Sequence, residues 1–293
     1  PTFGEWERTV LRHTAGLVDH ISVHAYYEET PGDPASFLAS GAALDAYIGE
    51  VADIIDEVRA ERGITTPIGI SVDEWNVWNQ TRWNEVDKPA VFTGDWPVAP
   101  RLIEDDYTVT DAVVVGSLLI TMLRRADRVS MANLAQLVNV IAPIRTEPGG
   151  VAWRQTTFFP FQLTAAAASG NVVVPSIETG VIATARYGDV GAVDAVATLE
   201  GDELTVFVVH RGLEAETPVT IDLGRSAASA EALVLTVPAG GDRHTVNSAS
   251  SQPVAPASLA VDIRDGAVTL TLPPLSWARV SVRLNPGTNR VTP

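Results

Sequence analysis

The spacing of apolar residues changes once along the chain, near residue 168, and this change restricts the possible folds more than any other feature. Before it, segments with the three-to-four-residue period of a helix face alternate with short apolar segments typical of strands. Strands that alternate with helices form parallel sheets through right-handed β-α-β units. From Asn171 onward the period is two. The sequence therefore predicts an α/β part followed by an all-β part.

The α/β part covers residues 1–168 and has three predicted strands. Its clearest helix carries an apolar stripe from Leu44 to Val58 and ends at Gly63, a residue that favours the end of a helix. A long loop containing Trp83 and Trp96 follows the second strand. The predicted strands cover residues 18–27, 67–72 and 128–134, and the further predicted helices cover 9–17, 106–125 and 153–168.

The all-β part covers residues 169–293, and its predicted strands are spaced about ten residues apart. Turn signals such as Glu200-Gly201-Asp202 and Asp265-Gly266 separate them, which is typical of a β-sandwich. No Gly/Ser-rich or Pro-rich linker joins the two parts, so we expect them to pack rigidly. The predicted strands cover residues 172–175, 192–199, 203–210, 219–223, 232–237, 259–263, 268–272 and 278–282.

Composition excludes several classes of function. The net charge is −16, and Lys88 is the only lysine, so nucleic acid and anionic membranes are not expected partners. There is no cysteine, which excludes disulfides, thiolate metal sites and a cysteine nucleophile. The longest apolar stretches fall short of the roughly 20 residues that span a bilayer. The chain opens at Pro1 without a methionine or a signal peptide, and we therefore expect it to be part of a longer chain.

Glu74 is the strongest candidate for a catalytic residue. It follows a strand of buried type, and the active sites of α/β barrels form at the carboxyl ends of the strands. Six of the seven tryptophans precede residue 168, and Trp75, Trp78 and Trp83 lie close to Glu74 in sequence. Aromatic rings stack on sugars, and carboxylates and amides bind hydroxyl groups, so this mixture suits a carbohydrate. A helix-capping acid beside core tryptophans is the alternative.

Tyr26 ends the preceding strand, and His24 lies two residues earlier on the same face. Tyr26 could hydrogen-bond a nucleophilic carboxylate at the mouth of a barrel, or it could only anchor a loop. His20 and His24 lie about 13 Å apart on an extended strand, too far to hold one metal ion. We therefore expect no metal and no cofactor.

Two other groups of polar residues are weaker candidates. Gln136 and Asn139 follow the third strand and could bind ligand hydroxyls, although packing or helix capping would explain them equally well. The acidic segment Glu104-Asp105-Asp106 is typical of the first turn of a helix, with a metal role as the less favoured alternative.

Four segments, in this order, strongly resemble the α-L-arabinofuranosidases of glycoside hydrolase family 51. They are Val18-Asp19-His20-Ile21-Ser22-Val23-His24-Ala25-Tyr26-Tyr27, Ile70-Ser71-Val72-Asp73-Glu74-Trp75-Asn76-Val77-Trp78, Ala135-Gln136-Leu137-Val138-Asn139-Val140-Ile141-Ala142-Pro143-Ile144 and Ala152-Trp153-Arg154-Gln155-Thr156-Thr157-Phe158-Phe159-Pro160-Phe161. The resemblance covers residues 1–168 by motif and the rest by position and pattern. It implies a (β/α)8 TIM barrel followed by a jelly-roll-like β-sandwich, and a retaining mechanism.

The resemblance also implies roles for particular residues. Glu74 matches the catalytic nucleophile, and Tyr26 matches the tyrosine beside it. His24 matches a histidine in direct contact with the substrate, and Trp78 and Gln136 match positions that line the arabinose pocket. The family's acid/base glutamate normally lies in an Asn-Glu pair on the fourth barrel strand. The only Asn-Glu here is Asn84-Glu85, which follows the nucleophile.

We therefore interpret the three strands as the last three of eight. The expected protein is an exo-acting enzyme that removes terminal arabinofuranosyl residues from arabinan or arabinoxylan oligosaccharides, with its acid/base residue on a missing N-terminal part. The resemblance implies that the protein is a homo-oligomer. A companion N-terminal chain would complete the active site. The expected location is the cytoplasm. The alternatives are a non-catalytic fragment, a carbohydrate-binding module, or an endoglucanase-like or xylosidase-like activity.

Overall fold

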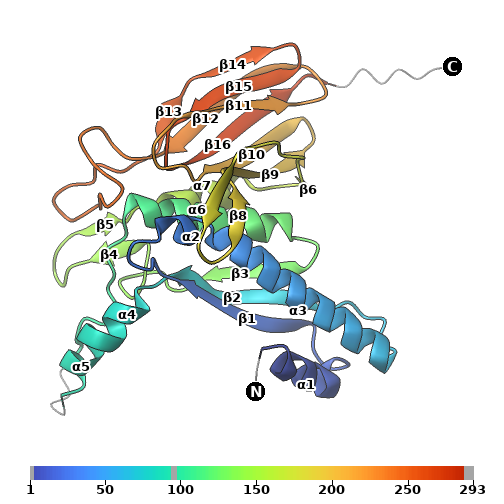
Figure 1. Ribbon diagram of the computed structural model, residues 1–293, viewed down its shortest axis with the longest axis vertical. Coiled ribbons are helices and arrows are strands. Elements are labelled where there is room, and N and C mark those ends of the chain that lie inside the picture. The colour runs from blue at the N-terminus through green and yellow to red at the C-terminus, as the bar shows by residue number, and fades with distance from the viewer. Residues whose placement is uncertain (1–2, 94–97, 287–293) are drawn as a thin grey trace.

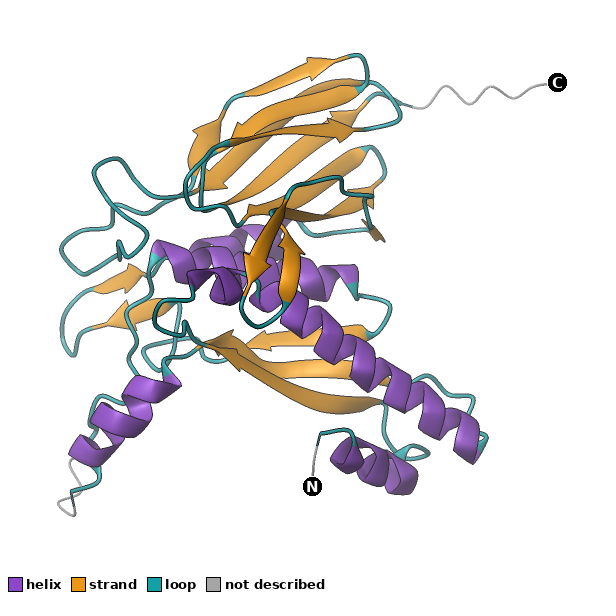
Figure 2. Cartoon of the chain, viewed as in Figure 1, coloured by secondary structure: helices purple, strands orange, loops and turns teal. Residues whose placement is uncertain are grey.

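The computed structural model describes residues 3–93 and 98–286, so Trp96 of the predicted long loop lies outside the described residues. A parallel sheet flanked by helices lies at one end of the molecule, and antiparallel sheets lie at the other (Figures 1 and 2). The predicted change from an α/β part to an all-β part is confirmed.

The parallel sheet contains β1 (His20–Tyr27), β2 (Gly69–Val77) and β3 (Val129–Leu134) in the order β1-β2-β3. Within the described residues β1 pairs with β2 alone, so its other edge has no strand partner. The helices are α1 (Glu5–Thr14), α2 (Pro34–Leu38), α3 (Ser40–Arg62), α4 (Gln80–Arg82), α5 (Lys88–Val91), α6 (Val109–Arg124) and α7 (Phe158–Ala167), with a π-helical turn at Trp83–Asp87.

Apolar spacing and end signals explain the two long helices. The predicted stripe of α3 is buried from Leu44 to Val58, and Gly63 takes the left-handed conformation that ends the helix, at φ 64°. Thr108 and Asp111 form a reciprocal capping box at the start of α6. Helix α6 is buried on nearly every side, from Ala112 to Met122, as expected of a helix covered all round.

The all-β part is a sandwich of two antiparallel sheets. The larger sheet has the order β13-β12-β16-β10-β9-β6, and the smaller has the order β11-β15-β14. Their strands are β6 (Asn171–Val173), β9 (Val193–Glu200), β10 (Glu203–His210), β11 (Thr217–Asp222), β12 (Ala227–Leu235), β13 (Ala257–Leu259), β14 (Val261–Arg264), β15 (Ala267–Leu272) and β16 (Ser276–Leu284). Each of the eight predicted strand segments overlaps an observed strand.

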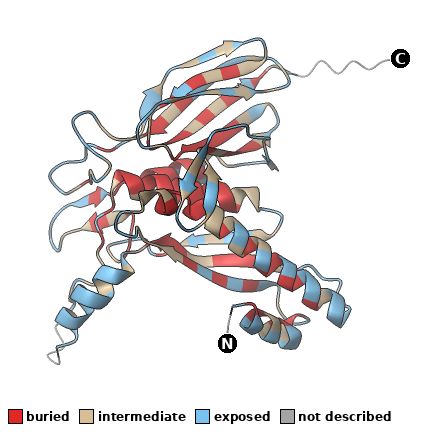
Figure 3. Ribbon diagram, in the orientation of Figure 1, coloured by how far each residue is buried: buried red, intermediate tan, exposed pale blue. Residues whose placement is uncertain are grey.

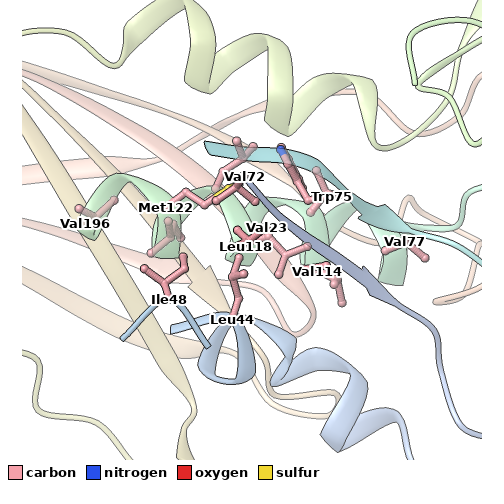
Figure 4. Close-up of a cluster of buried hydrophobic side chains, with 14 of the residues drawn as sticks. Val23, Leu44, Ile48, Val72, Trp75, Val77, Val114, Leu118, Met122 and Val196 are labelled. Carbon is pink, nitrogen blue, oxygen red and sulfur yellow. The ribbon is translucent and has the colours of Figure 1, made fainter. Parts of the chain in front are cut away.

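One hydrophobic core joins the two parts. Helix α6 lies between the parallel sheet and the larger sandwich sheet, and burial is continuous across it (Figure 3). Val72 and Trp75 of β2 belong to the same buried cluster as Leu118 of α6 and Val196 of β9 (Figure 4). The expected close packing of the two parts is confirmed. The sandwich has a second, separate cluster between its own two sheets.

Several local features differ from the predictions, among them the first helix, which covers Glu5–Thr14 in place of residues 9–17. Strand β2 continues past Val72 to Val77. The predicted helix 153–168 begins only at Phe158, because Ala152–Arg154 (β5) pairs with Ile144–Thr146 (β4). The predicted loop contains α4, α5 and the π-helical turn. A hairpin of β7 (Val181–Thr184) and β8 (Gly188–Gly191) was not predicted. No helix in the described residues is both long and apolar enough to cross a bilayer.

Candidate active site

An irregularity in the pairing of β1 with β2 positions the candidate nucleophile. Val23 pairs with Val72, but His24 pairs with Glu74, so Asp73 is an extra residue in β2. A bulge of this kind re-aims the side chains that follow it. Trp75 is consequently fully buried in the core, whereas the side chains of Asp73 and Glu74 are 38% and 47% exposed. Strict alternation from Val72 would instead have turned Glu74 towards the helices.

Tyr26 and Glu74 meet at the carboxyl ends of β1 and β2, as predicted. The Tyr26 hydroxyl donates a hydrogen bond of 2.7 Å to Glu74 Oε2. Burial raises the pKa of Tyr26, and the hydrogen bond to Glu74 and the charge of that carboxylate raise it further. Tyr26 therefore stays protonated at neutral pH and acts as a fixed donor. Because Glu74 accepts this bond from within a strand, the helix-capping alternative is wrong.

His24 lies between the two carboxylates on the exposed face of the sheet. Its Nδ1 atom is 3.6 Å from Glu74 Oε2, and its Nε2 atom is 3.5 Å from Asp73 Oδ1. Ser22, on the same face of β1, donates a hydrogen bond of 2.6 Å to Asp73 Oδ1. These contacts hold Asp73 against His24, and His24 against Glu74. The sequence does not link Asp73 and Ser22 to this cluster, because no residue pattern indicates the bulge that turns Asp73 to this face.

Trp78 also joins the cluster. Its ring packs edge-to-face against Tyr26, with 5.2 Å between ring centroids. The Trp78 backbone N–H donates to the Tyr27 carbonyl, which fixes the segment that follows β2 beside the end of β1. Tyr26, His24, Glu74 and Trp78 are therefore brought together. We name these four residues the Glu74 cluster.

Gln136 lies just beyond β3, and its residue is exposed. Its backbone N–H donates to the Ile141 carbonyl, and within the described residues its side chain has no hydrogen bond to the Glu74 cluster. The fully buried Asn76 of β2 fixes this segment, because its side-chain amide donates to the carbonyls of Ala135 and Ile141. Gln136 is therefore at the same edge of the sheet, and within the described residues it forms no hydrogen bond with Glu74.

The other candidates have structural partners. The Asn139 side chain bonds to Thr146, which supports the packing interpretation. Glu104 and Asp106 form ion pairs with Arg145. The buried Asp105 accepts a hydrogen bond from the backbone N–H of Asn79. All three acids precede α6, which begins at Val109, so their assignment to its first turn is wrong.

Comparisons with known proteins show the family to which this chain is similar. Residues 73–276 match the family described as the α-L-arabinofuranosidase C-terminal domain. An exo-α-(1→6)-L-arabinofuranosidase of Bifidobacterium longum is 44% identical, over 96% of this chain and 56% of its own length. An intracellular exo-α-(1→5)-L-arabinofuranosidase of Streptomyces lividans is 45% identical, over 94% of this chain and 41% of its own length. The chain thus spans about half the length of these curated relatives.

Solved structures of α-L-arabinofuranosidases are also similar to this chain over about half of their own length. A family 51 α-L-arabinofuranosidase from Bifidobacterium longum superposes with a TM-score of 0.88 and 39% identity, over 97% of this chain and 57% of that one. The α-L-arabinofuranosidase of Thermotoga maritima, solved as an arabinose complex, superposes with a TM-score of 0.78 over 96% of this chain and 56% of that one. At 23% identity, the latter shows the shared fold alone. By sequence and by structure, this chain belongs to the α-L-arabinofuranosidases of glycoside hydrolase family 51 and carries the family's C-terminal domain.

Proposed function

We propose that this protein is a retaining, exo-acting α-L-arabinofuranosidase in which Glu74 is the nucleophile. The observation that carries the proposal is the hydrogen bond from Tyr26 to Glu74 Oε2 at the carboxyl ends of adjacent parallel strands. A nucleophilic carboxylate must be ionised and aimed at the anomeric carbon. A protonated tyrosine that donates to one oxygen favours the ionised form and leaves the other oxygen for attack.

The remaining cluster residues have roles that fit this chemistry. In the proposed reaction Glu74 attacks the anomeric carbon, the glycosidic bond breaks, and water later releases arabinose from the covalent intermediate. His24 Nδ1 lies 3.6 Å from Glu74 Oε2, close enough to orient the carboxylate, and His24 is proposed to bind a sugar hydroxyl. The Trp78 ring packs edge-to-face against the Tyr26 ring and adds an aromatic surface to the cluster. Gln136, at the same edge of the sheet, is proposed to bind a hydroxyl of the arabinose.

A retaining glycosidase also needs a second carboxylic acid, about 5–5.5 Å from the nucleophile, to protonate the leaving oxygen. In the described part of the chain, the other carboxylate beside His24 is Asp73, which already accepts a hydrogen bond from Ser22. Glu85, of the only Asn-Glu pair, is exposed in the π-helical turn. We therefore propose that the acid/base glutamate comes from polypeptide outside these 293 residues, either N-terminal to them or in a companion chain.

In this proposal residues 1–168 are the last three β/α units of a (β/α)8 barrel, and residues 169–293 are a jelly-roll-like sandwich domain. Within residues 3–93 and 98–286, β1 has a strand partner on one edge only. This supports the first assignment, since closing a barrel pairs every strand edge. Two sheets packed around their own apolar cluster support the second.

The proposed substrates are arabinan and arabinoxylan oligosaccharides with terminal arabinofuranosyl residues. Support comes from the relatives described as exo-α-(1→6)- and exo-α-(1→5)-L-arabinofuranosidases. A cytoplasmic location is proposed because several relatives are described as intracellular. We further propose a homo-oligomer, on the resemblance to the family alone.

The function is tested by Glu74→Ala in the enzyme that carries this sequence. Turnover of an aryl α-L-arabinofuranoside should be lost, and azide should restore it by forming an arabinosyl azide of inverted configuration. Glu85→Ala is the matched control and should keep full activity, because Glu85 is exposed and belongs to no part of the cluster. Sugar binding without turnover in the unmutated protein would favour the alternative, a non-catalytic carbohydrate-binding protein.

A further inference from the structure

A small polar cavity lies next to the Glu74 cluster and has no role in the proposed reaction. Its volume is about 260 Å³. Tyr26 and Tyr27 at the end of β1 line one side of it, and Arg186 and Tyr187 at the tip of the β7–β8 hairpin line another. Glu28, Gln80, Ser36 and Ser40 supply further polar groups, and Phe37 also lines the cavity. Because Tyr26 lines the cavity and also bonds to Glu74, the cavity adjoins the proposed catalytic centre.

The hairpin that supplies two of these residues is held in place. It leaves the sandwich part and reaches α2 beside the parallel sheet (Figure 1). The backbone N–H of Arg186 donates to Ser36 Oγ at 3.2 Å, which ties the tip to α2. Within the tip, Thr184 Oγ accepts from the N–H of Tyr187 and donates to the carbonyl of Gly188. Arg186 and Tyr187 are therefore presented to the cavity by a fixed backbone.

The lining groups suit a neutral ligand rich in hydroxyl groups. The Arg186 guanidinium stacks over the Tyr187 ring at 5.5 Å and, within the described residues, forms no ion pair, so its donors are available. The Glu28 carboxylate is fixed by the backbone N–H and the hydroxyl of Thr81. The charged side chains of the lining are Arg186 and Glu28, so the net charge of the lining is zero. This disfavours an anionic ligand. Tyrosine rings next to such groups favour a sugar ring.

We propose that this cavity is a subsite that binds one neutral sugar residue of the substrate on the leaving-group side of the bond that is cleaved. The proposal rests on the proposed exo-arabinofuranosidase function. In an exo-acting enzyme the arabinose at Glu74 is terminal, so any other sugar residue nearby belongs to the leaving group. A cavity of about 260 Å³ is below the usual size of drug-binding pockets and fits one pentose. Arg186 and Tyr187 then become specificity residues contributed by the sandwich part.

The test is a titration of the enzyme that carries this sequence with arabinotriose, followed by NMR, in a Glu74→Gln background that prevents hydrolysis. The backbone signals of Arg186 and Tyr187 and the Arg186 side-chain Nε–H signal should shift on binding. Arg186→Ala and Tyr187→Ala should each raise the Kd for arabinotriose about tenfold or more. Asp189→Ala is the matched control, because Asp189 is exposed in the same hairpin and does not line the cavity, and its Kd should not change.

Two results would overturn the subsite. One is an unchanged Kd in both Arg186→Ala and Tyr187→Ala. The other is the absence of shifts at the hairpin tip, whether arabinotriose binds elsewhere or does not bind at millimolar concentrations. Either result leaves the proposed function standing if Glu74→Ala still abolishes turnover with azide rescue. Conversely, full activity in Glu74→Ala refutes the proposed function whatever the titration shows.

Discussion

At the scale of single residues, one extra residue in β2 determines which side chains face the open side of the sheet and which face the core. Because Asp73 interrupts the alternation, Glu74 faces the open side of the sheet and Trp75 fills the core. Both placements are favourable, since a buried carboxylate without a partner costs several kcal/mol and a buried indole contributes a large apolar area. The same irregularity therefore stabilises the fold and exposes the proposed nucleophile.

The hydrogen bond from Tyr26 leads to the first prediction at this scale. Tyr26→Phe keeps the ring against Trp78 but removes the donor to Glu74. A hydrogen bond to a charged group contributes about 1.5–3 kcal/mol, so kcat/KM should fall roughly 10- to 150-fold. Steady-state kinetics on an aryl arabinofuranoside measures this, with circular dichroism to check the fold. A Tyr26→Phe enzyme with unchanged kcat/KM would show that the hydrogen bond does not assist the reaction.

The raised pKa of Asp111 predicts that the free energy of unfolding depends on pH. Burial, together with the charges of Asp105 and Glu29, raises the pKa of Asp111 to about 6, against the lowering effect of its hydrogen bonds with Thr108. A folded-state pKa above the unfolded value means that the folded chain binds the proton more tightly. The stability from this group is therefore present below about pH 4 and is lost as the pH rises through 6.

Asp111→Asn keeps the cap and removes this dependence. Relative to the unmutated chain, its free energy of unfolding should rise by about 1–2 kcal/mol between pH 4 and pH 7. Urea denaturation at several pH values measures the difference. Asp189→Asn, at an exposed position, is the control and should show no such trend. Parallel pH curves for Asp111→Asn and the unmutated chain would contradict the assignment.

At the scale of secondary-structure elements, α6 depends on a close approach that only glycine permits. A Cβ atom at Gly116 would lie 2.2 Å from Cδ1 of Trp277 in β16, whereas one at Gly49 in α3 would have Arg125 Nη2 at 3.6 Å as its nearest neighbour. Gly116→Ala should therefore lower the free energy of unfolding by about 1–3 kcal/mol or more, despite alanine's better helix propensity. Gly49→Ala should be neutral or stabilising by up to about 1 kcal/mol. Thermal denaturation compares them, and equal effects would show that the α6–β16 contact is loose.

The same elements show which features the sequence predicts and which it does not. The stripe of α3 and the glycine that ends it are local signals, so this helix is predicted closely. In β10 the expected alternation is wrong, because the strand is buried on both faces from Thr205 to His210. Tyr26 and Glu74 were predicted to meet because both end parallel strands. The bulge at Asp73, the strand pair β4–β5 and the β7–β8 hairpin depend on tertiary partners. Arg186 and Tyr26 line one cavity although 160 positions separate them. The sequence does not predict this, because the hairpin that brings them together has no strong turn signal.

At the scale of the whole molecule, the two parts share a core and should not be separable. Phe207 and Trp277 of the larger sandwich sheet belong to the same buried cluster as α6 and the parallel sheet. Deleting residues 171–293 would expose the apolar side of α6 that faces the sandwich. The shortened enzyme should be insoluble or unstable, as judged by size-exclusion chromatography and thermal denaturation. Recovery of a soluble protein with unchanged turnover would show that the sandwich is dispensable.

The central claim, that Glu74 forms a covalent bond to arabinose, can be measured directly. An activated 2-fluoro arabinofuranoside has a leaving group that needs no protonation, while the fluorine slows hydrolysis of the intermediate. After incubation with the enzyme that carries this sequence, proteolysis and mass spectrometry identify the labelled peptide. We predict a single 2-fluoro-arabinosyl adduct on Glu74, with none in Tyr26→Phe at early times when the unmutated enzyme is already labelled. An adduct on another carboxylate, or steady turnover through inversion without any adduct, would contradict the account.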